Sequence, residues 1–571
     1  MIDVRGWVPG IQTVTTYKVS WLPRDLVAGI VLTTLLVPQG MAYAELAGLP
    51  AITGLYTSIL CLLAYAVFGP SRILVLGPDS SLGPMIATVL IGALGAGADP
   101  AEAVALASTL GLLVGVMLVL AGVAKLGFLA DLLSHPTQVG YMNGLALTIL
   151  IGQLPKLFGF SVDADGMIAE ARGFVEGVAD GKIVPAAVTV GVLGLAVIVA
   201  LRRWAPRLPG VLIAVVLSIL AVAVFGLEAR GVDTVGVLPQ GLPSFELPSL
   251  DLSDLGILAA GALGITLVSL TDTISTASAF AARTGQEVRG NQEMVGIGAA
   301  NVAASFFQGF PVSTSGSRTA VAQQSGSRTQ VTGVVGAVAI SLLLVFAPGL
   351  MRDLPQPTLA AVVIAAALSL ADFPAMSLLW RRRRVEFWLG IAAFLGVAIL
   401  GVLPGIAVAV GLSVLNVFRK VWWPYQAVLG RAAGVSGYHD VSVYPDAERL
   451  PGLLLFRFDA PLIFANARVF RDRIREFART EPGLKWIVVA AEPITDVDTT
   501  AADVLEELDR ELNEQGISLV FAEMKSPVHD KIDRYHLTRT IDPGHFFPTI
   551  EDAIAAFRRE TGAQWPASGP H

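Results

Sequence analysis

The sequence predicts an α-helical polytopic membrane protein followed by a small water-soluble α/β domain. Hydrophobic residues make up 54% of its 571 residues and charged residues only 15%, whereas soluble globular proteins carry about 25% charged residues. Residues 1–424 contain 46 charged side chains with no net charge, and residues 425–571 contain 39 and supply the whole formal charge of −7. We therefore expect a lipid-embedded domain over 1–424, and a connector with a water-exposed domain over 425–571.

Fourteen apolar segments within the first 424 residues are predicted to form membrane helices. A bilayer core about 30 Å thick requires roughly 20 apolar helical residues to cross it. The segments lie at 26–44, 51–68, 80–95, 101–122, 129–153, 183–201, 209–226, 255–281, 290–308, 315–325, 328–347, 356–371, 385–402 and 404–421. The third and tenth are short and follow breaks rich in Gly, Pro and Ser, which indicates half-helices.

The distribution of Lys and Arg between the loops predicts the orientation of these segments, because positive residues favour the cytoplasmic side. With the N-terminus inside, seventeen basic residues, including the run Arg381–Arg384, fall on the cytoplasmic side, and five fall outside. Removing any one segment would invert all later loops and spoil this distribution. We therefore expect a multi-pass protein of the cell inner (plasma) membrane with both termini in the cytoplasm.

The two half-helices occupy the same place, third of seven, in the two halves of this region. Repeat one covers about 24–226 and repeat two about 255–421. Because seven is odd, the second half starts on the opposite side of the membrane, so the halves are predicted to be inverted repeats. Interrupted segments at matching positions are the best sequence indication of a transporter's binding site near the bilayer midplane.

Each break supplies residues suited to starting a helix inside the membrane. The first reads VLGPDSSLGP (75–84) and the second GFPVSTSGSRT (309–319). A helix start leaves about four unpaired N–H groups and about half a positive charge, so two starts aimed at one point attract an anion. Arg318, one turn into the second half-helix, either faces that anion or pairs with a nearby acid and braces the helix. The serines of both breaks either contact substrate or only cap the helices.

The spacing of hydrophobic residues along the chain changes beyond Pro424. Strand, turn and strand are predicted over 452–467, further strands at 485–494 and 517–524, and amphipathic helices at 468–480, 499–516 and 549–559. Alternation of strands and helices predicts a small layered α/β domain.

Three motifs in the membrane region resemble the SulP family of anion transporters. They are VPQGMAYAELAGLP (37–50), GLYTSILCLLAYAVFGPSR (54–72) and FPVSTSGSRTAV (310–321). The likeness covers nearly the whole chain, and the C-terminal domain resembles the STAS domain common in this family. The resemblance implies a seven-plus-seven inverted repeat in which the first to fourth and eighth to eleventh segments form a core domain and the others a gate domain. It also implies a homodimer and an elevator-type movement of core against gate.

By position, the resemblance places the anion site between the third and tenth helices, near the first. The substrate-binding residues that it nominates are Gln39, Tyr43, Ser80, Ser315, Gly316, Ser317 and Arg318. Thr314 and Gly316 differ from the family's commoner Gly and Phe, which alters the size of the pocket and leaves the substrate open.

Acids inside the membrane are costly, and they usually line a pathway or pair with another group. In a sodium-coupled bicarbonate branch of the resembled family, an acid and a Thr four residues later help to form a sodium site, which corresponds here to Asp272 and Thr276. Alternatively, Asp272 forms an ion pair with Arg318. Glu45 lies where proton-coupled members keep an acid, or is a solvated helix-end residue. Asp79 is expected to cap the first half-helix.

The C-terminal domain carries Asp498-Thr499-Thr500 at a strand-to-helix turn. STAS domains of the anti-sigma antagonist type present a phosphorylatable Ser at this place. Thr499 is therefore either a regulatory phosphate acceptor, since a helix start favours the added charge, or only a helix cap. The domain is also a candidate surface for a regulatory protein partner.

The leading hypothesis is secondary active transport or exchange of a small oxyanion, nominally sulfate, with Na⁺ or H⁺ as candidate coupling ion and no other cofactor. Sodium- or proton-coupled transport of bicarbonate or C4-dicarboxylates is an alternative on the same fold. A nucleobase permease, which Arg318 argues against, and a membrane-anchored STAS sensor are further alternatives. Neither an enzyme nor a nucleic-acid partner is indicated, and the sequence has no Walker-type loop for an ATP-driven pump.

Overall fold

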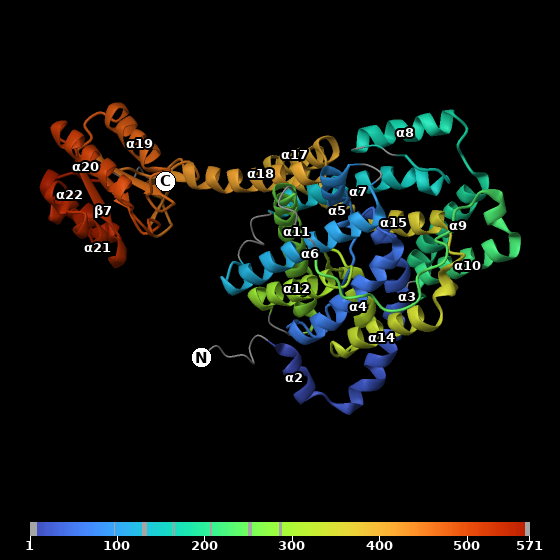
Figure 1. Ribbon diagram of the computed structural model, residues 1–571. Helices are drawn as coiled ribbons and strands as arrows, with labels where there is room; N and C mark the ends of the chain where they lie inside the picture. Colours follow the sequence, from blue (N-terminus) through green and yellow to red (C-terminus); the bar gives the residue numbers. More distant parts are fainter. Residues whose placement is uncertain are drawn as a thin grey trace. The chain divides into compact units, whose positions relative to one another are not determined.

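The computed structural model describes residues 8–95, 98–127, 134–162, 164, 166–205, 208–248, 254–284 and 288–565. The chain divides into two compact units, Met1–Ser413 and Val414–His571 (Figure 1).

The first unit is helical. Its helices are α2 (Pro9–Thr16), α3 (Leu22–Leu46), α4 (Ala51–Phe68), α5 (Gly83–Leu94), α6 (Pro100–Val123), α7 (His135–Leu157), α8 (Met167–Ala179), α9 (Pro185–Trp204), α10 (Gly210–Phe225), α11 (Leu255–Thr284), α12 (Gly290–Ser305), α13 (Gly316–Gln324), α14 (Val331–Phe346), α15 (Gln356–Leu370), α16 (Phe373–Arg382), α17 (Arg384–Leu400) and α18 (Val402–Trp422), the last of which continues into the second unit. Two short strands, β1 (Leu76–Gly77) and β2 (Ser313–Thr314), precede α5 and α13.

These helices agree with the predicted membrane architecture. Each of the fourteen predicted segments coincides with one described helix. Seven helical stretches among the described residues are long and apolar enough by themselves to cross a membrane, and α5, α10 and α14 are apolar but shorter. The short helices α2, α8 and α16 lie outside the predicted spans and were not predicted from the sequence.

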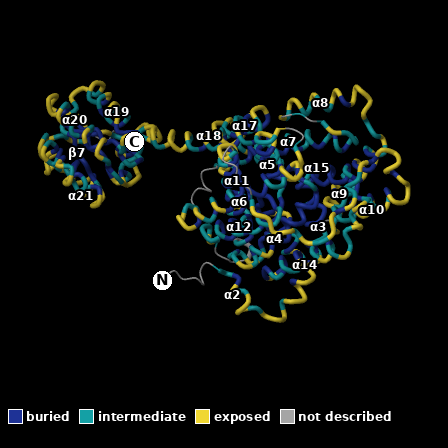
Figure 2. Tube along the Cα trace, in the orientation of Figure 1, coloured by how far each residue is buried: buried dark blue, intermediate teal, exposed yellow. Residues whose placement is uncertain are grey.

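Two groups of helices form the first unit. One connected group contains α3, α4, α6, α11, α12 and α14, and a second contains α7, α9, α10, α15 and α17. The grouping corresponds to the expected core and gate domains, and α3 joins them through contacts with α10 and α15. Figure 2 shows the buried positions running along α3 and α4, whereas α8 is largely exposed.

Glycine permits the closest helix contacts in both groups. A Cβ atom added to Gly115 of α6 would lie 2.8 Å from the carbonyl oxygen of Gly298 in α12. A Cβ atom added to Gly140 of α7 would lie 1.9 Å from the carbonyl oxygen of Gly390 in α17. Small residues are favoured at such crossings because lipid supplies no hydrophobic force between helices, so that association depends on close packing.

The second unit is a layered α/β domain. Its sheet has the order β4 (Tyr438–Asp440), β3 (Gln426–Arg431), β5 (Leu453–Phe458), β6 (Trp486–Ala490), β7 (Ser518–Ala522) and β8 (Phe546–Phe547). β5 to β8 are parallel, and β3 is antiparallel to both of its neighbours. The helices are α19 (Ala467–Thr480), α20 (Thr499–Glu514), α21 (Ser526–Arg534) and α22 (Ile550–Thr561). One apolar cluster packs the sheet with α19, α20 and α21, and another packs it with α22.

The prediction of a second strand within 452–467 was wrong. Beyond β5, only Leu462 forms an isolated bridge, with Val497. Asn466 closes a turn here, because its side-chain oxygen accepts from the amide of Ile463 at 3.0 Å and its amide group donates to the carbonyl of Pro461 at 2.9 Å. An apolar run does not reveal whether a strand or a buried turn will form, because both bury apolar side chains.

Candidate functional site

The two chain breaks meet in the interior of the first unit. β1 and β2 pair antiparallel, with Leu76 opposite Thr314 and Gly77 opposite Ser313. The amide of Ser315 donates to the carbonyl of Val75 at 3.1 Å. The half-helices α5 and α13 therefore start on opposite sides of one shared crossing, as expected for an inverted repeat.

Side chains from neighbouring helices hold the crossing in place. The carboxamide of Asn301 in α12 accepts from the amide of Val312 at 2.9 Å, and its NH₂ group donates to the Val312 carbonyl at 3.3 Å. Ser269 of α11 donates to the same carbonyl at 3.1 Å. Thr319 accepts from the amide of Val75 at 3.1 Å. The extended backbone thus has its hydrogen bonds satisfied at membrane depth, which lipid could not provide.

Arg318 is the largest fully buried side chain of the described chain, with an exposed fraction of 0%. None of its three guanidinium nitrogens has a hydrogen-bond partner among the described residues. A guanidinium carries five N–H donors, and an uncompensated charge in the membrane interior is costly. The site is therefore short of an acceptor for these donors.

Asp79 is the carboxylate nearest to this guanidinium. Its Oδ2 atom lies 3.7 Å from Nη2 of Arg318. Its Oδ1 atom accepts from the amide of Ser81 at 3.0 Å and from the Ser81 hydroxyl at 2.9 Å. Asp79 therefore closes the turn before α5 and compensates Arg318 in part. The prediction that Asp79 caps the first half-helix was wrong, because α5 has no side-chain cap.

Ser81 connects two carboxylates. Its hydroxyl oxygen lies 2.9 Å from Oδ1 of Asp79 and 3.0 Å from Oδ2 of Asp272 in α11. One hydroxyl has one proton to donate, so it can satisfy only one ionised carboxylate. The two acids therefore share one hydroxyl donor, and Arg318 supplies a positive charge beside Asp79.

The alternative in which Asp272 forms an ion pair with Arg318 is wrong. The ion pair of Arg318 is with Asp79, and Asp272 is bonded to Ser81 instead. Arg318 pairs with Asp79 rather than Asp272 because the turn before α5 places the Asp79 carboxylate beside the guanidinium. The alternative in which serines cap the half-helices is also wrong, because neither α5 nor α13 has a side-chain cap.

Several nominated residues surround the crossing. Tyr43 of α3 is 5% exposed and interacts electrostatically with Asp79 and Arg318. Ser80 is buried beside Tyr43. At the start of α13, the Ser315 hydroxyl lies 3.1 Å from that of Ser317. Thr276 lies close to Gly316, since a Cβ atom added to Gly316 would be 4.0 Å from the Thr276 hydroxyl.

Gln39 is the nominated residue least connected to this group. It is half-buried on α3 and makes no side-chain hydrogen bond within the part of the chain that the structure describes. Two other polar groups are more informative: the hydroxyl of Ser313, one of the serines of the second break, and the hydroxyl of Tyr141, which the sequence did not indicate. The hydroxyls of Ser313 and Tyr141 are buried without a partner among the described residues, and Tyr141 of α7 interacts electrostatically with Asp272 and Asp79. No motif marks Tyr141, because its place depends on packing between the two helix groups.

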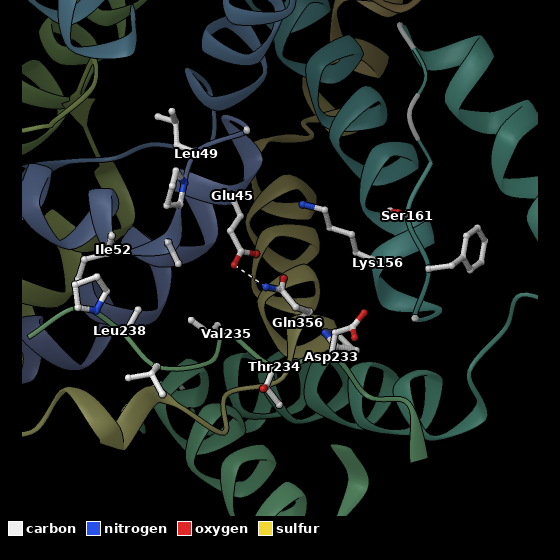
Figure 3. Close-up of a pocket in the computed structure, with 18 residues that line it drawn as sticks. Glu45, Leu49, Ile52, Lys156, Ser161, Asp233, Thr234, Val235, Leu238 and Gln356 are labelled. Atoms are coloured by element: carbon white, nitrogen blue, oxygen red, sulfur yellow. Dashed lines mark hydrogen bonds between the residues drawn. The ribbon is translucent and has the colours of Figure 1, made fainter. Parts of the chain in front are cut away.

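Glu45 lies away from the crossing, in a cavity of about 760 Å³ (Figure 3). The carboxamide of Gln356 at the start of α15 donates to Glu45 Oε1 at 2.9 Å. Figure 3 shows the Lys156 side chain of α7 directed toward the same carboxylate, with Asp233 on the opposite wall. Glu45 is therefore a half-buried, hydrogen-bonded residue near the end of α3, at the seam between the helix groups.

Thr499 is the first residue of α20 and is exposed. The cap of α20 is Asp498, whose carboxylate accepts from the amide of Ala501 at 2.8 Å and from that of Phe464 at 2.7 Å. The alternative in which Thr499 caps the helix is therefore wrong. Its hydroxyl stays accessible at a helix start.

Two family profiles match the chain. The profile of the sulfate permease family matches residues 22–393, and the STAS domain profile matches residues 444–553. A Mycobacterium tuberculosis protein named as a probable sulfate transporter is 42% identical over 555 residues, which covers 97% of this chain and 98% of that protein.

Two solved structures share the fold. The murine solute carrier 26 family member A9, described as an anion transporter in the inward-facing state, superposes with a TM-score of 0.89 at 23% identity, covering 97% of this chain and 94% of that one. The transmembrane domain of the cyanobacterial bicarbonate transporter BicA gives a TM-score of 0.59 at 23% identity and covers 68% of this chain and 97% of that one. The membrane fold and the C-terminal STAS domain are thereby established for this chain.

Proposed function

Because the chain belongs to the sulfate permease family, a family of membrane anion transporters, we propose that it moves a small oxyanion, nominally sulfate, by secondary active transport or exchange. The observation that carries the proposal is the buried Arg318 guanidinium, none of whose nitrogens has a hydrogen-bond partner among the described residues. An oxyanion such as sulfate offers several acceptor oxygens, two of which can accept from the fork of N–H donors that a guanidinium presents. The relative named as a sulfate transporter supports sulfate as the first substrate to test.

The anion would lie at the crossing of β1 and β2. The starts of α5 and α13 contribute unpaired N–H groups and positive dipole ends. Tyr43, Ser80, Ser315 and Ser317 supply hydroxyls around the same point. Fixed donors of this kind can replace the water shell that the anion loses on entering the protein.

Translocation would proceed by an elevator-type movement of the core group against the gate group. The anion crossing belongs entirely to core elements, so it can move as one body. The Glu45–Gln356 hydrogen bond joins α3 of the core to α15 of the gate, and the cavity around it lies at their seam. Such a bond would have to break in each cycle.

Cation coupling would act through Asp79, Ser81 and Asp272. The single hydroxyl between two carboxylates favours a bound proton or a cation at this place. Because Asp79 also pairs with Arg318, the charge of this group and the occupancy of the anion site would depend on one another. Sodium at Asp272 and Thr276, which lie one helical turn apart on α11, is the alternative coupling ion.

We further propose that the chain works as a homodimer in the inner membrane with both termini in the cytoplasm, and that its STAS domain receives regulatory input. The charge distribution of the loops supports the orientation. The exposed Thr499 at the start of α20 supports a phosphate acceptor there.

The deciding experiment is uptake of radiolabelled sulfate, bicarbonate and succinate by proteoliposomes, with and without imposed sodium and proton gradients. Wild-type protein should show saturable uptake of sulfate, and Arg318→Ala should lose at least about 100-fold of it, because a charge-assisted anion contact is lost. Bicarbonate or succinate flux in place of sulfate would select an alternative substrate. Saturable uptake by Arg318→Ala at the wild-type rate would contradict the proposed site, and absence of any anion flux would favour a sensor.

A further inference from the structure

α16 is a short helix on the surface of the gate group, and three contacts hold it there. Asp372 caps it by accepting from the amide of Ala375 at 2.9 Å. Asn143 of α7 bonds both backbone groups of Asp372, at 2.8 and 3.3 Å. Met376 packs on α17, where its sulfur would lie 3.3 Å from a Cβ atom added to Gly390. The helix is therefore firmly placed against α7 and α17.

Large apolar side chains of α16 and α17 remain exposed. The exposed fractions are 66% for Phe373, 47% for Trp380 and 60% for Trp388. Trp380 also packs edge-on against Phe387 of α17, with ring centroids 4.9 Å apart. Exposed Trp and Phe on an amphipathic helix beside membrane spans are typical of the boundary between lipid tails and headgroups.

Four consecutive arginines follow these aromatic residues. Arg381 to Arg384 are all exposed. Arg383 pairs with Glu386 at 3.2 Å, and the Arg384 guanidinium lies 5.4 Å from the ring centre of Trp380. In the described stretches of the chain, no carboxylate forms a salt bridge with Arg381, Arg382 or Arg384. Apart from the Arg383–Glu386 pair, this surface thus presents positive charge with no ion-pair partner among the described residues.

We propose that α16 and Arg381–Arg384 form a binding site for the headgroups of anionic phospholipids in the cytoplasmic leaflet. The predicted orientation puts this run on the cytoplasmic side. Guanidinium groups bind phosphate oxygens with fork-like geometry, and the adjacent aromatic rings fit the depth at which a headgroup joins its acyl chains. The positive charge of the arginines favours a ligand that carries a phosphate group. The exposed aromatic rings favour a lipid over a free phosphate, because they can contact its acyl chains.

The site has a mechanical consequence within the proposed function. α16 is bonded to α7 and α17, which belong to the gate group. Lipids held at this place would fix the gate group in the bilayer while the core group moves. Binding of lipid is nevertheless measurable without any transport, so failure of this inference and failure of the proposed function are separate outcomes.

The test is native mass spectrometry of the purified full-length chain after addition of phosphatidylglycerol or phosphatidylcholine. Wild-type protein should retain phosphatidylglycerol in preference to phosphatidylcholine. The triple variant Arg381→Gln/Arg382→Gln/Arg384→Gln should lose about fivefold in phosphatidylglycerol affinity for each charge, on the order of 100-fold in all. Arg468→Gln/Arg479→Gln/Arg559→Gln removes three exposed, unbridged arginines of the described STAS domain and should leave retention unchanged.

Two further arms make the result decisive. The triple Arg→Lys variant at 381, 382 and 384 keeps the charge and should keep most of the retention, and added salt should weaken it. Soluble glycerol phosphate in excess should compete poorly, because it lacks acyl chains. Strong competition by glycerol phosphate would show a phosphate site rather than a lipid site and would overturn the proposal. Equal retention of phosphatidylglycerol and phosphatidylcholine by wild-type protein would also overturn the proposal. This result is expected if acidic groups from another part of the chain cover the arginines.

Discussion

The carboxylate of Asp79 lies 3.7 Å from the guanidinium of Arg318, and the Ser81 hydroxyl links that carboxylate to Asp272. These residues come from the first chain break, the second half-helix and α11. The pair places a negative charge at the point where the proposed anion must bind. Asp79 is thus both a partner of Arg318 and a competitor of the proposed substrate.

Asp79→Asn should tighten anion binding. Removing a negative charge a few ångströms from the anion is worth more than about 1 kcal/mol at the effective dielectric of a protein site, so KM for the transported anion should fall at least about fivefold. Turnover should slow and lose its dependence on pH, because Asn cannot exchange a proton. Uptake measured over a range of anion concentrations and pH values tests this. A raised KM would show that Asp79 supports the anion rather than competes with it.

Gly77→Ala should impair the site through Arg318. A Cβ atom at position 77 would lie 2.8 Å from Nη1 of Arg318, so the guanidinium would have to move. Anion uptake should fall at least about tenfold, since catalytic and transport sites lose activity when a key group moves by about 1 Å. Gly256→Ala in α11 is the matched control, because a Cβ there meets open space. Unchanged uptake by Gly77→Ala would mean that the position of the guanidinium is not critical.

Asp272→Asn should remove the dependence of uptake on an imposed cation gradient. The variant keeps a hydrogen-bonding group for Ser81 but cannot take up a proton or present a full charge to sodium. Thr276→Val distinguishes sodium coupling from proton coupling. It should abolish only a response to sodium, because it deletes a candidate oxygen ligand of sodium and leaves the carboxyl group of Asp272 able to bind a proton. Uptake is measured under sodium and proton gradients in turn. A wild-type gradient response in Asp272→Asn would exclude this residue from coupling.

Asp509→Asn should stabilise the STAS domain at neutral pH. Asp509 is 2% exposed and accepts from Asn513 at 3.0 Å, and burial raises its pKa from 3.8 to about 6. Between these values the native state binds more protons than the unfolded state, so the free energy of unfolding falls as pH rises from about 4 to about 6 and then levels off. The neutral Asn avoids this loss, which amounts to about 2–3 kcal/mol.

Hydrogen exchange of the α20 and β6 amides in the full-length chain measures the difference. Protection should be greater in Asp509→Asn than in wild-type protein at pH 7.5, and the two should be equal near pH 4. Arg510→Gln, at the adjacent exposed position of the same helix, should not produce this pH-dependent difference. Equal protection at both pH values would mean that Asp509 is not destabilised by burial.

Much of the membrane fold is predictable from the sequence, because burial in lipid imposes a simple length and composition rule. All fourteen predicted segments coincide with helices, and the two breaks lie where β1 and β2 begin. The short helix α16 was missed, since an interfacial helix is neither apolar enough for a span nor polar enough for a loop.

The site was predictable in part. Arg318, Ser80 and Ser315 were marked by their places in the two breaks, and the structure brings those breaks together. The alternative that paired Arg318 with Asp272 was wrong, because the acid that reaches the guanidinium is decided by how the first break packs against α13. Tyr141 had no sequence signal, since its approach to the carboxylates depends on how the gate group packs on the core.

By itself, the sequence determined whether lipid or water surrounds each part of the chain, the order of its apolar helices, and the presence of a positive charge at a broken helix. These properties depend on composition and on neighbours along the chain. Only the tertiary structure decided which acid neutralises that charge, that one hydroxyl is shared between two carboxylates, and that Glu45 bonds across the seam to Gln356. Such relationships join residues far apart in sequence, and they depend on distances of a few ångströms that only the packing of several helices can set.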